Sequence, residues 1–226
     1  MDKCIACGAC SEKCPRKVAS EYDAGLAKRK AVYVPYAQAV PLKYAIDDKK
    51  CIYLTKGRCK KCEEVCPTDA IFYEDQAKEL TLNVGAVIMS GGSKPYDPAT
   101  HDVYGYKSSK NIVTSLEFER ILSASGPTMG HLVRPSDEKE PKKIAWIQCV
   151  GSRNEERPNC SRICCQSAVK NALAVKKSSP DTQVFVLYRD MRLYGQMESY
   201  YTEARKQGVI FVRFDKDHPP VAKASD

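Results

Sequence analysis

The sequence predicts a small α+β domain followed by an α/β domain with a parallel sheet. Two runs of closely spaced cysteines in the first 80 residues indicate the first domain. A strand, a helix and a second strand within residues 143–188 indicate the second, because a unit of this kind joins parallel strands. The chain has 226 residues, 43% of them hydrophobic, which suits one large or two small globular domains.

The first cysteine run, within residues 4–15, has the spacing C-x2-C-x2-C-x3-C-P, with which bacterial ferredoxins hold [4Fe–4S] clusters. The second run, within residues 51–67, ends in the same C-x2-C-x3-C-P pattern. Each iron of such a cubane takes one soft thiolate, and two residues between cysteines let a tight loop wrap one side of it. The runs therefore predict two cubanes, electron transfer and a ferredoxin-like domain over residues 1–80.

The fourth ligand of each cubane is expected to come from the other run, because the last cysteine of each run serves the other cluster in two-cluster ferredoxins. Cluster I is then held by Cys4, Cys7, Cys10 and Cys66. Cluster II is held by Cys51, Cys59, Cys62 and Cys14. The prolines that follow the runs, Pro15 and Pro67, suit the first turn of a helix, where no backbone N–H is needed.

Zinc sites and disulfides are the alternative uses of these eight cysteines. Zinc sites usually need two C-x2-C pairs rather than a triplet with a trailing Cys-Pro. A disulfide framework would need secretion, and Met1 to Cys4 lead directly into the cysteine motif without a signal peptide. Twelve cysteines in such a chain favour metal ligation in a reducing compartment, so we expect a cytoplasmic protein.

Residues 16–50, between the two runs, are expected to be extended and to cover the clusters, because their prolines disfavour a long helix. Residues 81–140 then form a connecting region. Its apolar segment Leu82–Met89 predicts a buried strand that ends in Ser90, Gly91 and Gly92. The rest of this region is rich in Gly, Ser, Pro and charge, with one short helix expected at 115–122.

Residues 141–226 predict a Rossmann-type α/β unit. Apolar strands are expected at 143–150, 182–188 and 209–212, and helices at about 161–177 and 198–207. The apolar face of the first helix recurs at helical spacing and comprises Cys165, Ala168, Val169, Ala172 and Val175. Parallel strands follow from this alternation of strands and helices.

A third cysteine group consists of Cys149, Cys160, Cys164 and Cys165. Cys149 ends a predicted strand, Cys160 precedes the next helix, and Cys164 and Cys165 lie in the first turns of that helix, where the helix dipole stabilises thiolates. In a parallel α/β unit these two places meet at the ligand crevice, so the four cysteines can converge. A third [4Fe–4S] cluster, a redox disulfide pair and free buried thiols remain open on spacing alone.

The turn after that strand lacks the dinucleotide fingerprint G-x-G-x-x-G. Only Gly151 remains of it, after Gln148, Cys149 and Val150. Pyrophosphate could not approach the backbone in the usual way, so a nicotinamide cofactor is not expected on this unit.

The formal charge of +8 counts cysteine as neutral. An oxidised cubane with four thiolates carries roughly −2, so three clusters would bring the total to about +2. Basic runs such as Lys28 to Lys30 and Lys60 with Lys61 therefore indicate a solvated face or a docking surface for an acidic partner rather than a nucleic-acid site. No apolar run approaches the length of a membrane span.

Several motifs together resemble the A-type iron–sulfur component of heterodisulfide reductase and its relatives, over nearly the whole chain. They are the stretches 21–26, 29–33, 35–41, 116–120, 125–128, 134–137, 147–153, 160–165 and 188–192, including Ile147-Gln148-Cys149-Val150-Gly151-Ser152-Arg153 and Cys160-Ser161-Arg162-Ile163-Cys164-Cys165. The resemblance implies a thioredoxin-reductase-like flavoprotein with an inserted two-cluster ferredoxin domain, whose clusters relay single electrons between a flavin and partner subunits. It also implies a further cluster on a cysteine, a spacer and C-x3-C-C, which Cys149, Cys160, Cys164 and Cys165 match.

The chain departs from that family at the flavin. The glycine-rich strand–turn–helix that grips the FAD diphosphate is absent, and Met89-Ser90-Gly91 stands where the family has Ala-Thr-Gly. Ser90 and Gly91 are the candidate flavin contacts, and FAD is expected only if another segment or chain completes the site.

The leading functional hypothesis is an electron-transfer subunit of a heterodisulfide-reductase-like oxidoreductase. The resemblance implies as partners the other subunits of the complex and an electron donor such as a ferredoxin, a hydrogenase or a dehydrogenase. The alternatives are an adaptor or assembly module with structural clusters, and a zinc protein that binds nucleic acid. No catalytic acid–base pair or nucleophile triad is evident.

Overall fold

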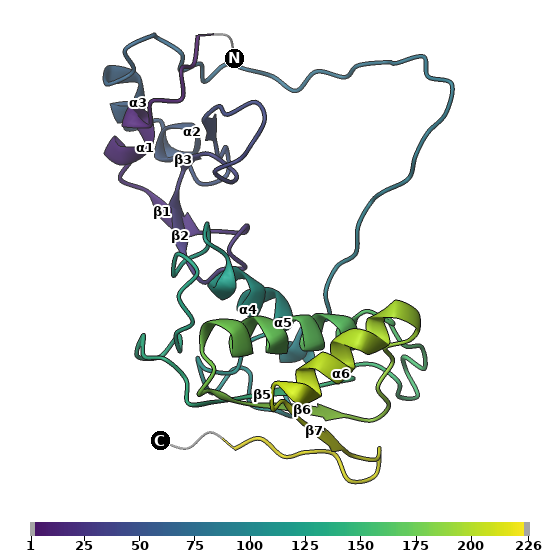
Figure 1. The fold of residues 1–226 in the computed structure, drawn as a ribbon. Coiled ribbons are helices and arrows are strands. Elements are labelled where there is room, and N and C mark those ends of the chain that lie inside the picture. The colour runs from purple at the N-terminus through teal and green to yellow at the C-terminus, as the bar shows by residue number, and fades with distance from the viewer. Residues whose placement is uncertain (1–2, 224–226) are drawn as a thin grey trace. The chain divides into compact units, whose positions relative to one another are not determined.

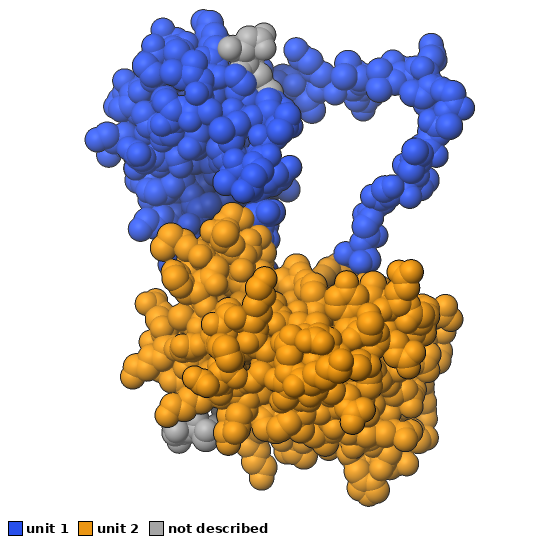
Figure 2. Space-filling model, in the orientation of Figure 1, with its two compact units in different colours: residues 1–93 blue, residues 94–226 orange. Residues whose placement is uncertain are grey.

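The computed structural model describes residues 3–223. They form two compact units, residues 1–93 and residues 94–226, which Figure 2 shows in different colours. Each unit has its own buried cluster of side chains.

The first unit is built from short elements around the cysteine runs (Figure 1). Its helices are α1 (Ala9–Lys13), α2 (Ile52–Lys56) and α3 (Lys61–Glu64). Its strands form two antiparallel pairs, β1 (Lys17–Ala19) with β2 (Lys28–Lys30) and β3 (Val32–Tyr33) with β4 (Ala45–Ile46). Residues 16–50 thus contain no helix, as expected, but only part of the segment is extended, because turns join its short strands. The small core contains three of the cysteines and comprises Cys10, Cys14, Ala31, Val32 and Cys62.

The prolines that follow the cysteine runs do not begin helices, so that prediction was wrong. Pro15 lies between α1 and β1, and Pro67 lies in a turn after α3. A residue before proline is pushed toward extended backbone. Cys14 has φ −64° and ψ 121°, and it therefore ends α1 and sends the chain into β1.

The second unit contains a parallel sheet, as the sequence predicts, and its strands lie in the order β5-β6-β7. The strands are β5 (Lys143–Ile147), β6 (Gln183–Tyr188) and β7 (Ile210–Arg213). Helix α5 (Cys164–Ser178) connects β5 to β6, and α6 (Glu198–Lys206) connects β6 to β7. Figure 1 shows the two helices alongside each other over the strands. Short 3-10 helices lie at Pro98–Thr100 and Gly195–Met197.

The core of this unit lies between the sheet and α5. The predicted apolar face of α5 is confirmed, because Ala168, Val169, Ala172 and Val175 are fully buried and Cys165 is 6% exposed. Helix α4 (Ser115–Leu122) matches its predicted bounds and begins at a capping box formed by Thr114 and Glu117. This helix adds Phe118, whose ring meets the edge of Trp146 of β5 at 5.0 Å between centroids.

The segment Leu82–Met89 is not a buried strand, contrary to the sequence prediction. It is extended but pairs with no strand among residues 3–223. Leu82 is 75% exposed, and Ile88 and Met89 are each 88% exposed. A strand is stabilised by ladder hydrogen bonds and by burial of one or both faces, and the described chain supplies neither here. No helix in the described range is long and apolar enough to span a lipid bilayer.

Candidate iron–sulfur sites

The four cysteines expected to hold cluster II line one pocket. They are Cys14, Cys51, Cys59 and Cys62, with Pro15, Ile52 and Tyr53 among the other lining residues. Cys14 comes from the first run, at the end of α1, whereas the other three come from the second run. The structure therefore brings the last cysteine of one run to the other run, as a crossed ligand set requires.

Local backbone geometry aims the second run at this pocket. Cys51 is the N-cap of α2, and Gly57 ends that helix in the left-handed conformation at φ 66°. Cys59 also has a left-handed φ of 79°. This conformation is uncommon for a residue with a side chain and costs on the order of 1–3 kcal/mol. The turn reverses the chain before α3, and it thereby places Cys59 and Cys62 in the same pocket as Cys51.

The cysteines expected to hold cluster I surround a tight loop. Ala6 and Gly8 both adopt left-handed backbone, at φ 58° and 86°, between successive cysteines. The loop lies against Tyr44, since a Cβ built on Gly8 would be 3.1 Å from the tyrosine oxygen. The pKa of Tyr44 is raised by burial and then by the nearby thiolates of the first run, namely Cys10, Cys7 and Cys4. The charges of these three cysteines therefore act on the same ring.

Cys66 follows α3, and α3 packs against α1, the helix that carries Cys10. The Cys66 sulfur accepts a hydrogen bond from the backbone N–H of Ala70 at 3.2 Å. Burial acts to raise the pKa of Cys66, but hydrogen bonds from Ala70 and Thr68 outweigh it and leave the pKa lowered. The surroundings of Cys66 thus favour the thiolate, which is the form that ligates iron.

Other cluster cysteines are buried enough to resist ionisation without a metal. Burial raises the pKa of Cys10 to about 11 and also raises the pKa of Cys62. The Tyr73 hydroxyl lies 3.1 Å from the Cys62 sulfur. A coordinating metal deprotonates a thiol outright, and donors such as Tyr73 then stabilise the resulting charge.

Two lysines of the intervening segment hold the backbone of the cluster cysteines, which sequence reasoning missed. The Lys30 ammonium donates to the carbonyl of Cys14 at 2.5 Å, and that of Lys43 donates to the carbonyl of Cys4. Arg29, next to Lys30, is paired with Glu21 and Asp47. The basic run at 28–30 is therefore partly engaged inside the unit. No motif signals these contacts, because they join residues 16 and 39 positions apart.

The third cysteine group is also brought together. Cys149 lies just beyond β5, which ends earlier than predicted, at Ile147. Cys164 and Cys165 lie in the first turn of α5, as predicted, although this helix begins later than expected and leaves Cys160 in the loop before it. Burial raises the pKa of Cys165, a backbone hydrogen bond from Arg192 opposes this rise, and the charges of the other members, Cys149, Cys160 and Cys164, add to it. Cys165 is buried and Cys164 is exposed, which matches adjacent residues that leave a helix in different directions.

Polar groups surround the sulfurs of this third group. The backbone N–H of Arg162 donates to the Cys160 sulfur at 3.3 Å, and the Ser161 hydroxyl lies 2.9 Å from the Cys164 sulfur. The Arg153 guanidinium lies 3.8 Å from the Cys149 sulfur. Sequence reasoning treated Arg153 only as part of a family motif. Its role beside a sulfur becomes visible only in the fold.

The backbone of this third site is unusually strained. Cys149, Arg153 and Arg162 all have left-handed φ values, of 63°, 59° and 63°. Gly151 lies between the first two at φ 66°, and a Cβ on it would be 2.4 Å from the ring of Tyr96. Left-handed non-glycine residues persist where the surrounding structure over-determines them, and they cluster at functional sites. Tyr96 also fills the space beside the one glycine left of the dinucleotide fingerprint.

No group of three or more His, Cys, Asp or Glu side chains within residues 3–223 is gathered closely enough to hold a single metal ion. A cubane has a different requirement. Each of its four irons takes one thiolate, so its ligands are spread around the cluster instead of meeting at one point.

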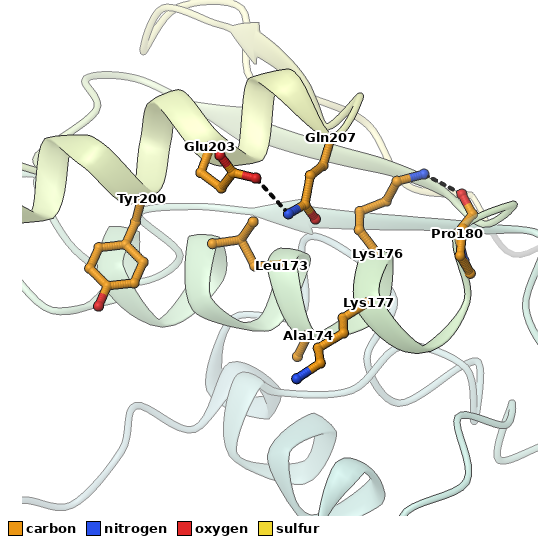
Figure 3. Close-up of a pocket in the computed structure, with 8 residues that line it drawn as sticks. All are labelled: Leu173, Ala174, Lys176, Lys177, Pro180, Tyr200, Glu203 and Gln207. Carbon is orange, nitrogen blue, oxygen red and sulfur yellow. Dashed lines mark hydrogen bonds between the residues drawn. The ribbon is translucent and has the colours of Figure 1, made fainter.

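Ser90 and Gly91, the candidate flavin contacts, are both exposed in the extended segment after Met89. A further hollow lies between α5 and α6 on the outer side of the second unit (Figure 3). Three of its polar side chains are engaged: Gln207 donates to Glu203 at 2.8 Å, and Lys176 donates to the carbonyl of Pro180 at 2.5 Å.

Comparison with known proteins agrees with the cysteine sites. Residues 3–70 match the family model of the 4Fe-4S dicluster domain. The first unit thus carries a segment similar to the 4Fe-4S dicluster domain.

The chain as a whole is similar to one component of a larger enzyme. It is 46% identical to the iron-sulfur A-subunit of the CoB–CoM heterodisulfide reductase of Methanocaldococcus jannaschii, over 93% of this chain and 32% of the relative. It is 45% identical to the A-subunit of the H2/formate:CoB–CoM heterodisulfide,ferredoxin reductase of Methanococcus maripaludis, over 94% and 32%. The resemblance to this component of heterodisulfide reductase is confirmed, and the chain is homologous to a segment of it. It spans about a third of the length of these relatives.

Proposed function

We propose that this chain relays single electrons through [4Fe–4S] clusters as part of a heterodisulfide-reductase-like oxidoreductase complex. The observation that carries the proposal is the pocket shared by Cys14, from the first run, and Cys51, Cys59 and Cys62, from the second. Crossed ligation ties two cubanes into one small unit and keeps them close, which suits electron transfer between them.

The proposed ligands follow the three cysteine groups. Cluster I is held by Cys4, Cys7, Cys10 and Cys66. Cluster II is held by Cys51, Cys59, Cys62 and Cys14. A third cluster is held by Cys149, Cys160, Cys164 and Cys165, supported by the position of Cys149 after β5 and of Cys164 and Cys165 at the start of α5, and by the electrostatic effect of the other three on Cys165. In domain terms we assign residues 1–80 to the two-cluster unit, 81–140 to a returning segment and connection, and 141–226 to the Rossmann-type unit.

Cubanes would supply one-electron redox chemistry. The chain's own residues limit water around the clusters, donate hydrogen bonds to the sulfurs and hold the backbone of the ligands. Burial of Cys10, Cys14, Cys51 and Cys62 limits water at the clusters. Donors such as Tyr73 and the N–H of Ala70 stabilise the sulfur charge. Lys30 and Lys43 hold the backbone of ligands in both expected clusters.

The flavin of the proposed complex requires structure beyond this chain. The segment Leu82–Met89 is apolar, extended and exposed, as expected of a strand that pairs with a sheet formed by another segment or chain. We propose that another segment or chain pairs with it, completes an FAD site and brings Ser90 and Gly91 to the cofactor. This would make the segment the returning strand of a thioredoxin-reductase-like domain.

The partners are proposed to be other subunits of the complex and an electron donor of the ferredoxin, hydrogenase or dehydrogenase type, in the cytoplasm. Exposed cations flank the cysteines of cluster II and comprise Lys49, Lys50, Lys56, Arg58 and Lys61. Such a surface favours an acidic redox protein and gives an association rate that falls with ionic strength.

Anaerobic iron and sulfide analysis with EPR on reduction tests the proposal. We expect about twelve irons per chain and reversible low-potential signals. A chain that binds iron but cannot be reduced reversibly would favour an adaptor or assembly module with structural clusters. A colourless protein that binds zinc would exclude both.

A further inference from the structure

We propose that Arg153, held in place by Asp190, is a positioning residue that makes the third cluster easier to reduce than it would be without this cation. The inference rests on the proposed function, in which Cys149, Cys160, Cys164 and Cys165 hold that cluster. It concerns what surrounds the ligands, not the ligands themselves.

Arg153 touches both an acid and a cysteine of the third group. One guanidinium nitrogen, Nη2, lies 2.5 Å from the Asp190 carboxylate, and the other, Nη1, lies 3.8 Å from the Cys149 sulfur. The guanidinium fork is rigid, so anchoring one nitrogen also sets the position of the other. The Arg153 side chain is only 15% exposed.

The backbone holds the same residue in place. Arg153 adopts a left-handed φ of 59°, which only surrounding structure can maintain. Its carbonyl accepts a hydrogen bond from the Arg189 guanidinium at 2.8 Å. Arg189 is the neighbour of Asp190, so the segment after β6 grips Arg153 at both its main chain and its side chain.

Asp190 reaches the cysteine group by a second route. Its backbone carbonyl lies 3.8 Å from the Cys165 sulfur. Its side chain is 44% exposed and also lies 3.6 Å from Arg213, which is 74% exposed. Water therefore screens the Asp190 carboxylate and Arg213 more than it screens Arg153.

Reduction of a cubane adds one negative charge to the cluster and its thiolates. Hydrogen bonds to the sulfurs and nearby net charge set the reduction potential of such clusters. A mostly buried cation beside the Cys149 sulfur stabilises the reduced form more than the oxidised form, because little water intervenes. The N–H of Arg162 and the hydroxyl of Ser161 act in the same direction but carry no full charge.

The test is an EPR-monitored redox titration of the full chain, reconstituted anaerobically, in the wild type and in R153Q. The signal of the third cluster is identified by its loss in C160S. We expect the midpoint potential of this cluster to move to a more negative value in R153Q, while the other two clusters keep theirs. R153K retains the charge without the fork and is expected to show a smaller shift of the same sign.

R213Q is the matched control. This variant also removes a positive charge that is paired with Asp190, but it leaves the surroundings of the Cys149 sulfur unchanged. The midpoint potential of the third cluster is therefore expected to stay close to that of the wild type. A shift in R213Q as large as that in R153Q would overturn a specific role for Arg153.

The remaining outcomes separate this inference from the proposed function. About twelve irons per chain with an unchanged potential in R153Q overturns the role of Arg153 alone. About eight irons in the wild type overturns the third cluster, and the role of Arg153 with it. If R153Q and R153K both lose the third cluster, Arg153 is needed to bind it, and the tuning role is wrong.

Discussion

The Lys30 ammonium donates a 2.5 Å hydrogen bond to the carbonyl of Cys14, the cysteine that the fold moves to the opposite run. Cys14 ends α1 in an extended conformation before Pro15. The contact ties a strand of the intervening segment to the residue on which the crossed ligand set depends. Residues between the two runs thus take part in building the cluster unit.

Cys14→Ser is expected to remove cluster II and to spare cluster I, because Cys14 shares a pocket with Cys51, Cys59 and Cys62. Iron content is expected to fall by about four per chain, and EPR would show which cluster is lost. Cys66→Ser is the matched variant and is expected to remove cluster I. Selective loss of cluster I in Cys14→Ser would show that each run fills its own cluster.

Lys30→Met is expected to weaken the hold on Cys14 without removing a ligand. A hydrogen bond that involves a charged group contributes about 1.5–3 kcal/mol, which predicts a loss of cluster II iron to a chelator that is faster by roughly tenfold to 150-fold. The decay of the visible absorbance under anaerobic chelation measures this rate. Lys28→Met is the control, because Lys28 lies on the same strand with an exposed side chain. This variant is expected to leave the rate of iron loss unchanged. Equal rates of iron loss in the wild type and in both variants would show that Lys30 does not stabilise cluster II.

The third cysteine group is expected to bind about four of the irons. The double variant Cys160→Ser, Cys164→Ser should lower the iron content of the full chain by that amount, because both sulfurs lie near buried Cys165. The dicluster signals of the first unit are expected to persist. An unchanged iron content would leave these residues as structural thiols.

NAD(P)H is not expected to bind the second unit. Gln148, Cys149 and Val150 replace most of the glycine fingerprint, and Tyr96 packs against Gly151, the glycine that remains. Titration calorimetry of the isolated chain is expected to show no heat of binding. Micromolar affinity would mean that the unit grips pyrophosphate in another way.

FAD is expected to bind this chain weakly or not at all. Ser90 and Gly91 are exposed, and the segment before them has no strand partner in the described range. Gel filtration after incubation with FAD, followed by a flavin absorbance spectrum, tests this. Stoichiometric retention of FAD would show that the chain alone builds the site.

The sequence by itself determined what depends on local spacing. The cysteine runs predicted an iron–sulfur unit, which the dicluster match confirms. Helical periodicity predicted the buried face of α5, because residues three and four apart share one side of a helix whatever packs against it. The parallel strands followed from the length of the connection between them.

Only the tertiary structure decided what depends on partners distant in the sequence. Leu82–Met89 has the composition of a buried strand, yet it is exposed because a strand also needs a neighbour, which composition cannot reveal. Pro15 was misjudged because its effect falls on Cys14 before it, not on a helix after it. The contacts of Lys30 with Cys14 and of Arg153 with Asp190 join residues 16 and 37 positions apart, and no local pattern encodes them. Such contacts exist only once the chain has folded, because only folding brings residues that are distant in the sequence within hydrogen-bonding distance of one another.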